Sequence, residues 1–228
     1  MLESIGILKG YDKKLHLHWN NNLVLSLATG GICLDLGCGD GLCREFAENL
    51  NYKWIGLDCI RQERTTCVAD AHFLPFGDEV FDMVLSTKVL EHLARPWEAL
   101  REVNRVLKPS GIFLGSVAFM ETFHSSYFHF THLGIKSIFE HTGFIVKAIS
   151  PGRFGTTMIC NSLLHPIRLT IPINLFTRII LELRRKFGVF YAKITEPKNL
   201  DLHKRAKTLA ISDKYRFAGE FSFLAIKR

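Results

Sequence analysis

Three glycines alternate with other residues in the stretch ICLDLGCGDGLC, which runs from residue 32 to residue 43. The apolar segment before the glycines has the length and composition of a buried strand, and a helical segment follows them. Glycine adopts positive φ angles at little cost and lets a bound molecule approach the backbone closely. The first turn of the following helix also offers unpaired N–H groups and a partial positive charge. The stretch predicts a strand–turn–helix unit with a ligand at the turn, and a tight turn without a ligand is the alternative.

The chain repeats this alternation of short apolar runs and amphipathic segments as far as residue 150. Strands are expected at residues 32–36, 53–58, 66–70, 80–86, 111–119 and 144–150, and helices at about 12–27, 42–50, 96–107 and 135–143. Pro96 is a helix start signal, and the Pro109–Gly111 segment is a stop signal. Because repeated βα units form a parallel sheet covered by helices, the sequence predicts an α/β fold with helices on both faces of a Rossmann-like sheet.

Composition and charge narrow the class of protein. The chain has 228 residues, 47% hydrophobic and 22% charged, which is typical of a globular protein. We find no signal peptide and no run of eighteen uncharged apolar residues, so a cytoplasmic protein without a membrane span is expected. The six cysteines lack paired spacing, which favours reduced thiols over disulfides or zinc, and no metal site is predicted.

The pattern changes after residue 150. From there on, fifteen Lys/Arg stand against five Asp/Glu, and the whole chain carries a formal charge of +7. We expect a core over residues 1–154, a basic apolar insertion over 155–210 and a final core strand within 211–228. Within the insertion, residues 174–190 form an amphipathic pattern that suits a lid on the same chain, a dimer contact or a helix lying on an anionic membrane.

A second signal, an acidic residue, follows the glycines. Asp58 ends the expected strand 53–58, about twenty residues after the glycine turn. An acidic residue in this position can accept hydrogen bonds from ribose hydroxyl groups. Nicotinamide enzymes and other adenosine-binding enzymes both fit this pattern, but the third glycine of the nicotinamide motif is absent near Arg44.

The motifs LDLGCGDG, GLD, ADAHFLPF, FDMV, EHL and REVNRVLKPSGIF follow one another in this order. Together they closely resemble class I S-adenosylmethionine-dependent methyltransferases, in particular the branch, similar to methyltransferase domain 11, that often modifies small molecules, lipids or sugars. The resemblance covers about residues 30–150 and the final strand. It implies a seven-stranded sheet whose last strand is antiparallel, with the cofactor over the carboxyl ends of the first four strands.

The resemblance also implies which residues bind S-adenosylmethionine. Residues at the ends of the first and fourth strands and in the glycine turn are expected near the methionine end of the cofactor: Asp35, Gly37, Gly39, Gly41, Ser86 and Thr87. Asp58 is expected to hold the ribose diol, with Cys59 beside the adenine. Asp70 is expected to accept from the adenine amino group, while the backbone of Ala71 reads the edge of the ring.

The methyl group of a sulfonium is already activated, so the protein has mainly to align the acceptor and exclude water. A general base helps when the acceptor is a hydroxyl, and His92 is the candidate because an imidazole side chain suits proton removal near neutral pH. Packing is the alternative role for His92. The aromatic-rich segment after the fifth strand is expected to contact the acceptor, with His124, Tyr127 and His129 as candidates.

The sequence therefore predicts a methyltransferase acting on oxygen or nitrogen of a small or lipid- or sugar-linked acceptor. A non-catalytic cofactor-binding scaffold is one alternative. A nucleic-acid methyltransferase is the other, suggested by the basic C-terminal third. The chain lacks the Asn/Asp-Pro-Pro-aromatic motif for flipped adenine and the Pro-Cys nucleophile for cytosine, so a nucleic-acid partner is not expected.

Overall fold

The computed structural model describes residues 11–12, 17–18, 22–121, 125–153, 155–156, 158–159, 170–195, 208–209 and 212–228. The chain divides into two compact units. The first consists of Met1–Phe119, Ser125–Gly152 and Phe221–Arg228, and the second of Met120–His124 and Arg153–Glu220.

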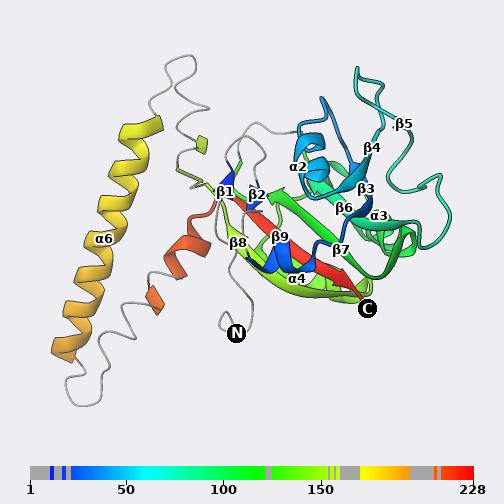
Figure 1. Cartoon of the computed structure of the whole chain (residues 1–228). Coiled ribbons are helices and arrows are strands. Elements are labelled where there is room, and N and C mark those ends of the chain that lie inside the picture. Colours follow the sequence, from blue (N-terminus) through cyan, green and yellow to red (C-terminus); the bar gives the residue numbers. More distant parts are fainter. Residues whose placement is uncertain are drawn as a thin grey trace. The chain divides into compact units, whose positions relative to one another are not determined.

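A seven-stranded sheet runs through the first unit (Figure 1). Its strands are β3 (Gly31–Leu36), β4 (Tyr52–Asp58), β5 (Cys67–Val68), β6 (Phe81–Thr87), β7 (Leu107–Ala118), β8 (Phe144–Pro151) and β9 (Glu220–Lys227). They lie in the order β5-β4-β3-β6-β7-β9-β8. The β3–β4, β3–β6, β4–β5 and β6–β7 pairs are parallel, whereas β8 and β9 are antiparallel. The predicted Rossmann-like sheet with an antiparallel last strand is confirmed.

The helices of the first unit are α1 (Asn22–Leu27), α2 (Arg44–Asn49), the short 3-10 helix η2 (Leu90–His92), α3 (Pro96–Val106) and α4 (His132–His141). The second unit contains the long helix α6 (Thr170–Thr195). Thr131 is the N-cap of α4, and its hydroxyl accepts a hydrogen bond from the amide of Gly134 at 3.0 Å.

The predicted N-terminal helix over 12–27 is wrong in its first part. Strand β1 (Tyr11–Asp12) pairs with strand β2 (Leu17–His18) in an antiparallel ladder, and α1 begins only at Asn22. The sequence Leu-His-Leu-His at residues 15–18 alternates with a period of two, which favours a strand over a helix.

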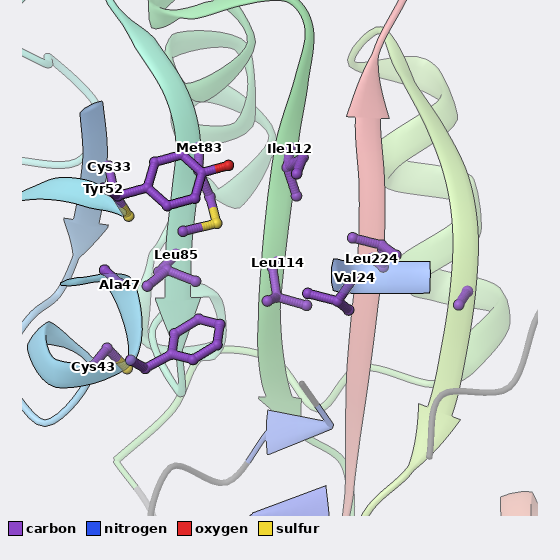
Figure 2. Packing of buried hydrophobic residues seen from close by; sticks show 12 residues of the cluster. Val24, Cys33, Cys43, Ala47, Tyr52, Met83, Leu85, Ile112, Leu114 and Leu224 are labelled. Atoms are coloured by element: carbon purple, nitrogen blue, oxygen red, sulfur yellow. The ribbon is translucent and has the colours of Figure 1, made fainter. Parts of the chain in front are cut away.

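Successive residues of the central strands belong to two different cores, because side chains alternate between the faces of a sheet. One core packs α1 and α2 against the sheet, as Figure 2 shows. Its fully buried members come from seven elements and include Val24, Cys33, Ala47, Met83, Leu85, Leu114, Ala148 and Leu224.

The other core is aromatic. The ring of Phe113 on β7 lies 5.4 Å from that of Phe139 on α4, 5.4 Å from Phe144 on β8 and 4.9 Å from Phe223 on β9, measured between centroids. All four side chains are fully buried. Burial of each phenyl ring contributes about 1.5–3 kcal/mol, so this cluster holds β9 between β7 and β8.

The strand order creates a ligand site at the carboxyl ends of the central strands. From β3 the chain continues to β4 and β5 on one side, and then crosses to β6 on the other side of β3. Connections that leave neighbouring strands in opposite directions open a crevice at the carboxyl ends of those strands, where α/β proteins bind their ligands.

Candidate cofactor site

The glycine turn follows β3 directly and requires its glycines. Gly37 has a φ of 69°, and a Cβ atom there would lie 2.3 Å from Cγ2 of Val89. Gly39 has a φ of 48°, and a Cβ atom there would meet nothing within 4 Å. Both residues thus have a conformation that side-chain-bearing residues rarely adopt, and at Gly39 the backbone borders open space.

The turn is hydrogen-bonded to the end of β4. The amides of Gly37 and Cys38 donate to the carbonyl oxygen of Leu57 at 2.8 and 3.0 Å. The amide of Gly39 donates to Oδ2 of Asp58 at 3.0 Å, and the amide of Ile60 donates to Oδ1 at 3.1 Å. One backbone amide therefore binds each oxygen of the Asp58 carboxylate, and each oxygen keeps a lone pair for a further donor.

Asp70 and Ala71 follow β5. Oδ1 of Asp70 accepts the His72 amide at 2.9 Å and lies 2.6 Å from Nδ1 of the His72 ring. The backbone hydrogen bond from His72, followed by that from its ring, lowers the pKa of Asp70. Asp70 is exposed and Ala71 is buried. The Asp70 carboxylate is therefore ionised and held in place by its neighbour.

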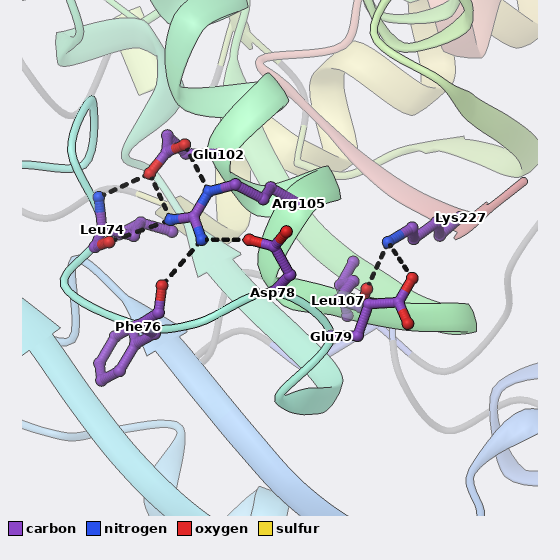
Figure 3. A network of polar contacts seen from close by, with 8 residues as sticks. All are labelled: Leu74, Phe76, Asp78, Glu79, Glu102, Arg105, Leu107 and Lys227. Atoms are coloured by element: carbon purple, nitrogen blue, oxygen red, sulfur yellow. Dashed lines mark hydrogen bonds and ion pairs between the residues drawn. The ribbon is translucent and has the colours of Figure 1, made fainter.

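Helix α3 anchors the loop that continues from Ala71, as Figure 3 shows. The Arg105 guanidinium donates to the carbonyl oxygens of Leu74 at 3.1 Å and Phe76 at 2.8 Å, and it pairs with Asp78 at 2.8 Å. Glu102 accepts from Arg105 and also from the Leu74 amide at 2.9 Å. These charge-assisted bonds fix the backbone of the loop.

A cavity of about 440 Å³ lies at these strand ends, within the size range of ligand sites. Its wall consists of Leu36, Gly37, Leu57, Asp58, Cys59, Ala69, Asp70, Ala71, Lys88, Val89, His92 and Leu93. Six residues predicted from the sequence thus meet at one cavity: Gly37, Asp58, Cys59, Asp70, Ala71 and His92.

Other predicted cofactor residues lie outside this wall: Asp35, Gly39, Gly41, Ser86 and Thr87. Asp35 is fully buried at the end of β3 and accepts a hydrogen bond from Nε1 of Trp54 at 3.0 Å. Burial raises the pKa of Asp35 to about 7, and the indole hydrogen bond opposes this rise. Its carboxyl group thus lies in the protein interior and not at the cavity wall.

The two predicted residues at the end of β6 also lie outside the cavity wall. Ser86 is completely buried, and its Oγ has no hydrogen-bond partner among the described residues. The hydroxyl of Thr87 lies 3.8 Å from the thiol of Cys43.

Burial raises the pKa of Cys59, and the charge of Asp58 raises it further, so this thiol at the cavity wall is neutral at physiological pH.

His92 lies in η2 with a defined tautomer. Its Nδ1 is 2.6 Å from the carbonyl oxygen of Ser125. A carbonyl oxygen only accepts, so Nδ1 carries the proton and Nε2 carries the lone pair of the neutral ring. His92 therefore presents a proton acceptor and belongs to the cavity wall.

Glu91 directly precedes His92 in η2, and its carboxyl group has a structural role. Its side chain is fully buried, and Oε1 accepts the amide of Ala118 at 2.9 Å. Its carbonyl oxygen accepts the amides of Tyr127 and Phe128 at 2.8 and 3.2 Å. Burial raises the pKa of Glu91. Glu91 thus joins the end of β7 and the segment before α4 to η2.

Tyr127 and His129, two of the predicted acceptor residues, are not part of the cavity wall. Tyr127 is 71% exposed, and His129 is also exposed. His124 lies outside the described residues. Their proposed contact with the acceptor remains a prediction.

Sequence reasoning missed several members of the wall, of which Lys88 is the most distinctive. It follows β6 directly and has a φ of 60°. The rule that ligands bind at the carboxyl ends of strands was the signal that could have found it. Among the described residues, no group of three or more His, Cys, Asp or Glu side chains is arranged to hold a metal ion.

Comparison with known proteins defines the class. Residues 34–115 match the family described as a methyltransferase domain. The match extends from β3 through most of β7. The family resemblance predicted from the motifs is confirmed, and with it the cofactor, S-adenosylmethionine.

Individual relatives differ in what they do. The chain is 36% identical over 104 residues to the mitochondrial arginine-hydroxylase NDUFAF5 of Danio rerio, covering 41% of this chain and 32% of that protein. It is 36% identical over 103 residues to the tRNA (carboxymethyluridine(34)-5-O)-methyltransferase of Arabidopsis thaliana, covering 40% and 25%. The chain thus spans about a third or less of the length of these two curated relatives.

A solved structure shares the fold. It is a putative sarcosine dimethylglycine methyltransferase from Galdieria sulphuraria, with a TM-score of 0.56 at 13% identity. The superposition covers 90% of this chain and 82% of the other.

Proposed function

We propose that the cavity binds S-adenosylmethionine and that the protein transfers the methyl group to oxygen or nitrogen of a small or lipid- or sugar-linked acceptor. The carboxylate of Asp58 is the observation that carries this proposal. Backbone amides on both sides hold it at the wall of the cavity, where it can accept two hydroxyl donors. A ribose diol offers such a pair of donors.

The residues present fit this cofactor. Gly39 leaves open space where a side chain would otherwise stand, and Gly37 forms part of the wall. Ala71 supplies a small side chain next to the ionised Asp70, which suits an adenine ring and its amino group. When bound, S-adenosylmethionine supplies an electrophilic methyl group on a sulfonium.

The protein's own residues have two tasks in this reaction. The apolar side chains of Leu36, Val89 and Leu93 exclude water from the wall. His92 accepts the proton of a hydroxyl acceptor at Nε2, while the Ser125 carbonyl holds its ring in place. A His92→Asn variant should keep its affinity for S-adenosylmethionine and lose 10²–10⁴-fold in turnover, as is typical of general bases. Unchanged turnover would leave His92 with a packing role.

The acceptor class is proposed from the segment that precedes α4. The relatives named above act on chemically unrelated targets, so their names do not define the acceptor of this chain. Tyr127 and His129 precede α4, and the amides of Tyr127 and Phe128 donate to the carbonyl oxygen of Glu91, the residue before His92. Ser125, whose carbonyl oxygen contacts the His92 ring, lies in the same segment. We propose that these side chains contact the acceptor and that the protein works in the cytoplasm.

Methylation of RNA is the second candidate function. The Arabidopsis relative acts on tRNA, and the formal charge of +7 suits a phosphate backbone. Incubation with methyl-labelled S-adenosylmethionine should transfer label to compounds in a small-molecule extract and leave tRNA unlabelled. Label in tRNA, together with salt-dependent tRNA binding, would favour the second function. Cofactor binding without any transfer would favour a scaffold.

The cofactor proposal is tested by titration calorimetry with S-adenosylmethionine. The Asp58→Asn variant keeps the shape of the side chain but loses its charge, so affinity should fall about 10–100-fold, corresponding to about 1.5–3 kcal/mol. Glu63→Gln is the matched control, because Glu63 is an exposed acid in the same connection between β4 and β5. Equal affinities of Asp58→Asn and the unmodified chain would remove Asp58 from the site.

A further inference from the structure

Helix α6 carries a continuous row of exposed apolar side chains. Eight large residues are each between 46% and 66% exposed: Leu175, Phe176, Ile179, Ile180, Leu183, Phe187, Phe190 and Ile194. Their spacing of three and four residues places them along one side of the helix, and we name them the α6 stripe. At 1.5 Å per residue, the α6 stripe extends over about 29 Å. An exposed apolar surface of this length marks an interaction site.

A different side of α6 contacts the rest of its own unit. Thr177 is 8% exposed, and its hydroxyl lies 3.0 Å from that of Thr156. Arg184 forms an ion pair with the buried carboxylate of Asp213. A Cβ atom at Gly188 would lie 3.3 Å from the side chain of Leu209. Within its unit, α6 thus packs through polar and small residues, and the α6 stripe faces away from these contacts.

Charge distinguishes between the possible partners of this surface. The 26 residues of α6 include five Lys/Arg and one glutamate. On the helix, Lys186 borders the α6 stripe, and Arg178 lies beyond the same border. Long basic side chains beside an apolar face reach toward anionic headgroups while their methylene stems stay in the apolar layer. A second copy of α6 would instead bring two basic helices together.

We propose that α6 is an interfacial helix that lies on the surface of an anionic membrane, with the α6 stripe among the acyl chains. Arg178 and Lys186 then contact the lipid headgroups. Among the described residues, no helix is long and apolar enough to cross a bilayer. In this proposal the helix lies parallel to the membrane surface. The proposed contact is independent of what the cofactor cavity binds.

Vesicle flotation with the full chain tests this proposal. The protein should float with vesicles of phosphatidylcholine and phosphatidylserine, and more weakly with phosphatidylcholine alone. The double variant Leu183→Gln/Phe187→Gln removes two large side chains from the α6 stripe, so binding should fall at least about tenfold. Arg178→Gln/Lys186→Gln should weaken binding to the anionic vesicles alone, by about fivefold for each charge, and added salt should have the same effect.

Controls separate this surface from its alternatives. Leu133→Gln changes a leucine on α4 that is 50% exposed, similar to Leu183 at 60%, and should leave flotation unchanged. The thermal unfolding temperature and the sedimentation of the free protein are measured for each variant. Failure to float with either vesicle, or equal flotation with both, would overturn the proposal. The proposal would also be overturned if the Leu183→Gln/Phe187→Gln variant kept its flotation. A loss of thermal stability in this variant would overturn it too, because it would indicate that another part of the same chain covers the α6 stripe. A changed oligomeric state would overturn it because it would indicate that a second copy covers the stripe.

Discussion

At the residue scale, Asp35 shows how burial changes the chemistry of a motif residue. Its carboxyl group is 1% exposed and hydrogen-bonded to the Trp54 indole. Burial raises its pKa to about 7, against 3.8 for an exposed aspartate. The unfolded chain releases this proton at lower pH than the folded protein does. Asp35 therefore favours folding most at acid pH, and this contribution is lost as the pH rises toward 7.

The Asp35→Asn variant should remove this pH dependence, because an amide oxygen still accepts the Trp54 hydrogen bond but does not titrate. Relative to the unmodified chain, the variant should gain about 1.4 kcal/mol of unfolding free energy per pH unit between about pH 4 and 7. Urea unfolding at pH 5 and at pH 8 measures the difference. Parallel stability profiles of the two proteins would show that the Asp35 pKa is not raised.

Lys88 illustrates strain at the same scale. Its φ of 60° places a residue with a side chain in the left-handed region, which costs about 1–2 kcal/mol. Such residues cluster at ligand sites, where the surrounding structure holds them in place. Lys88 belongs to the cavity wall, so its conformation agrees with the proposed location of the cofactor.

At the scale of elements, α3 links the sheet to the cofactor site. The helix buries Ala99, Leu100, Val103 and Val106 along one face. Arg105 carries the contact from this helix to the loop of residues 74–78. The position of Asp70 and Ala71 at the cavity therefore depends on a helix that does not itself reach the cavity wall.

The Arg105→Lys variant should weaken cofactor binding without removing the charge. Lysine cannot contact two carbonyl oxygens and two carboxylates at once, so the loop loses part of its support. Because Arg105 is about a third exposed, we expect a modest loss of about 1 kcal/mol in unfolding free energy. Thermal unfolding with and without S-adenosylmethionine measures both effects. Arg101→Lys, an exposed position on the same helix, is the control, and equal behaviour of the two variants would contradict this role for Arg105.

At the scale of the whole molecule, residues far apart in the chain form one core. Phe113, Phe139, Phe144 and Phe223 come from four elements, and β9 lies between β7 and β8 although it ends the chain. The last strand therefore completes the sheet only when the preceding strands are already in place or form with it.

Phe113→Ala should destabilise the protein by about 3–5 kcal/mol, because it leaves a cavity at the centre of this aromatic cluster. Urea unfolding measures the loss. Phe73→Ala changes a phenylalanine that is 69% exposed and should cost less than about 0.5 kcal/mol. Similar losses for both variants would show that the cluster is not the stabilising core.

Much of the fold could be predicted from local pattern. Alternating apolar runs located the strands of the first unit, and the glycines located the turn after β3. The predicted helix over 12–27 begins too early, because the alternation of Leu and His at residues 15–18 favours a strand. Within the site, Asp58 was found from its position at a strand end, whereas Lys88 was missed because nothing in its neighbours shows a left-handed backbone.

The sequence by itself determined most elements of the first unit, the glycine turn and the resemblance to the methyltransferase family that residues 34–115 match. These features depend on short-range periodicity and on residue types that tolerate only certain backbone angles. Only the tertiary structure decided which strand ends meet at the cavity, that Asp35 shares a hydrogen bond with Trp54, and that β9 separates β7 from β8. Strand pairing joins residues distant in the chain, and any strand with a suitable apolar face can in principle pair with another, so the order is selected by the packing of the whole molecule.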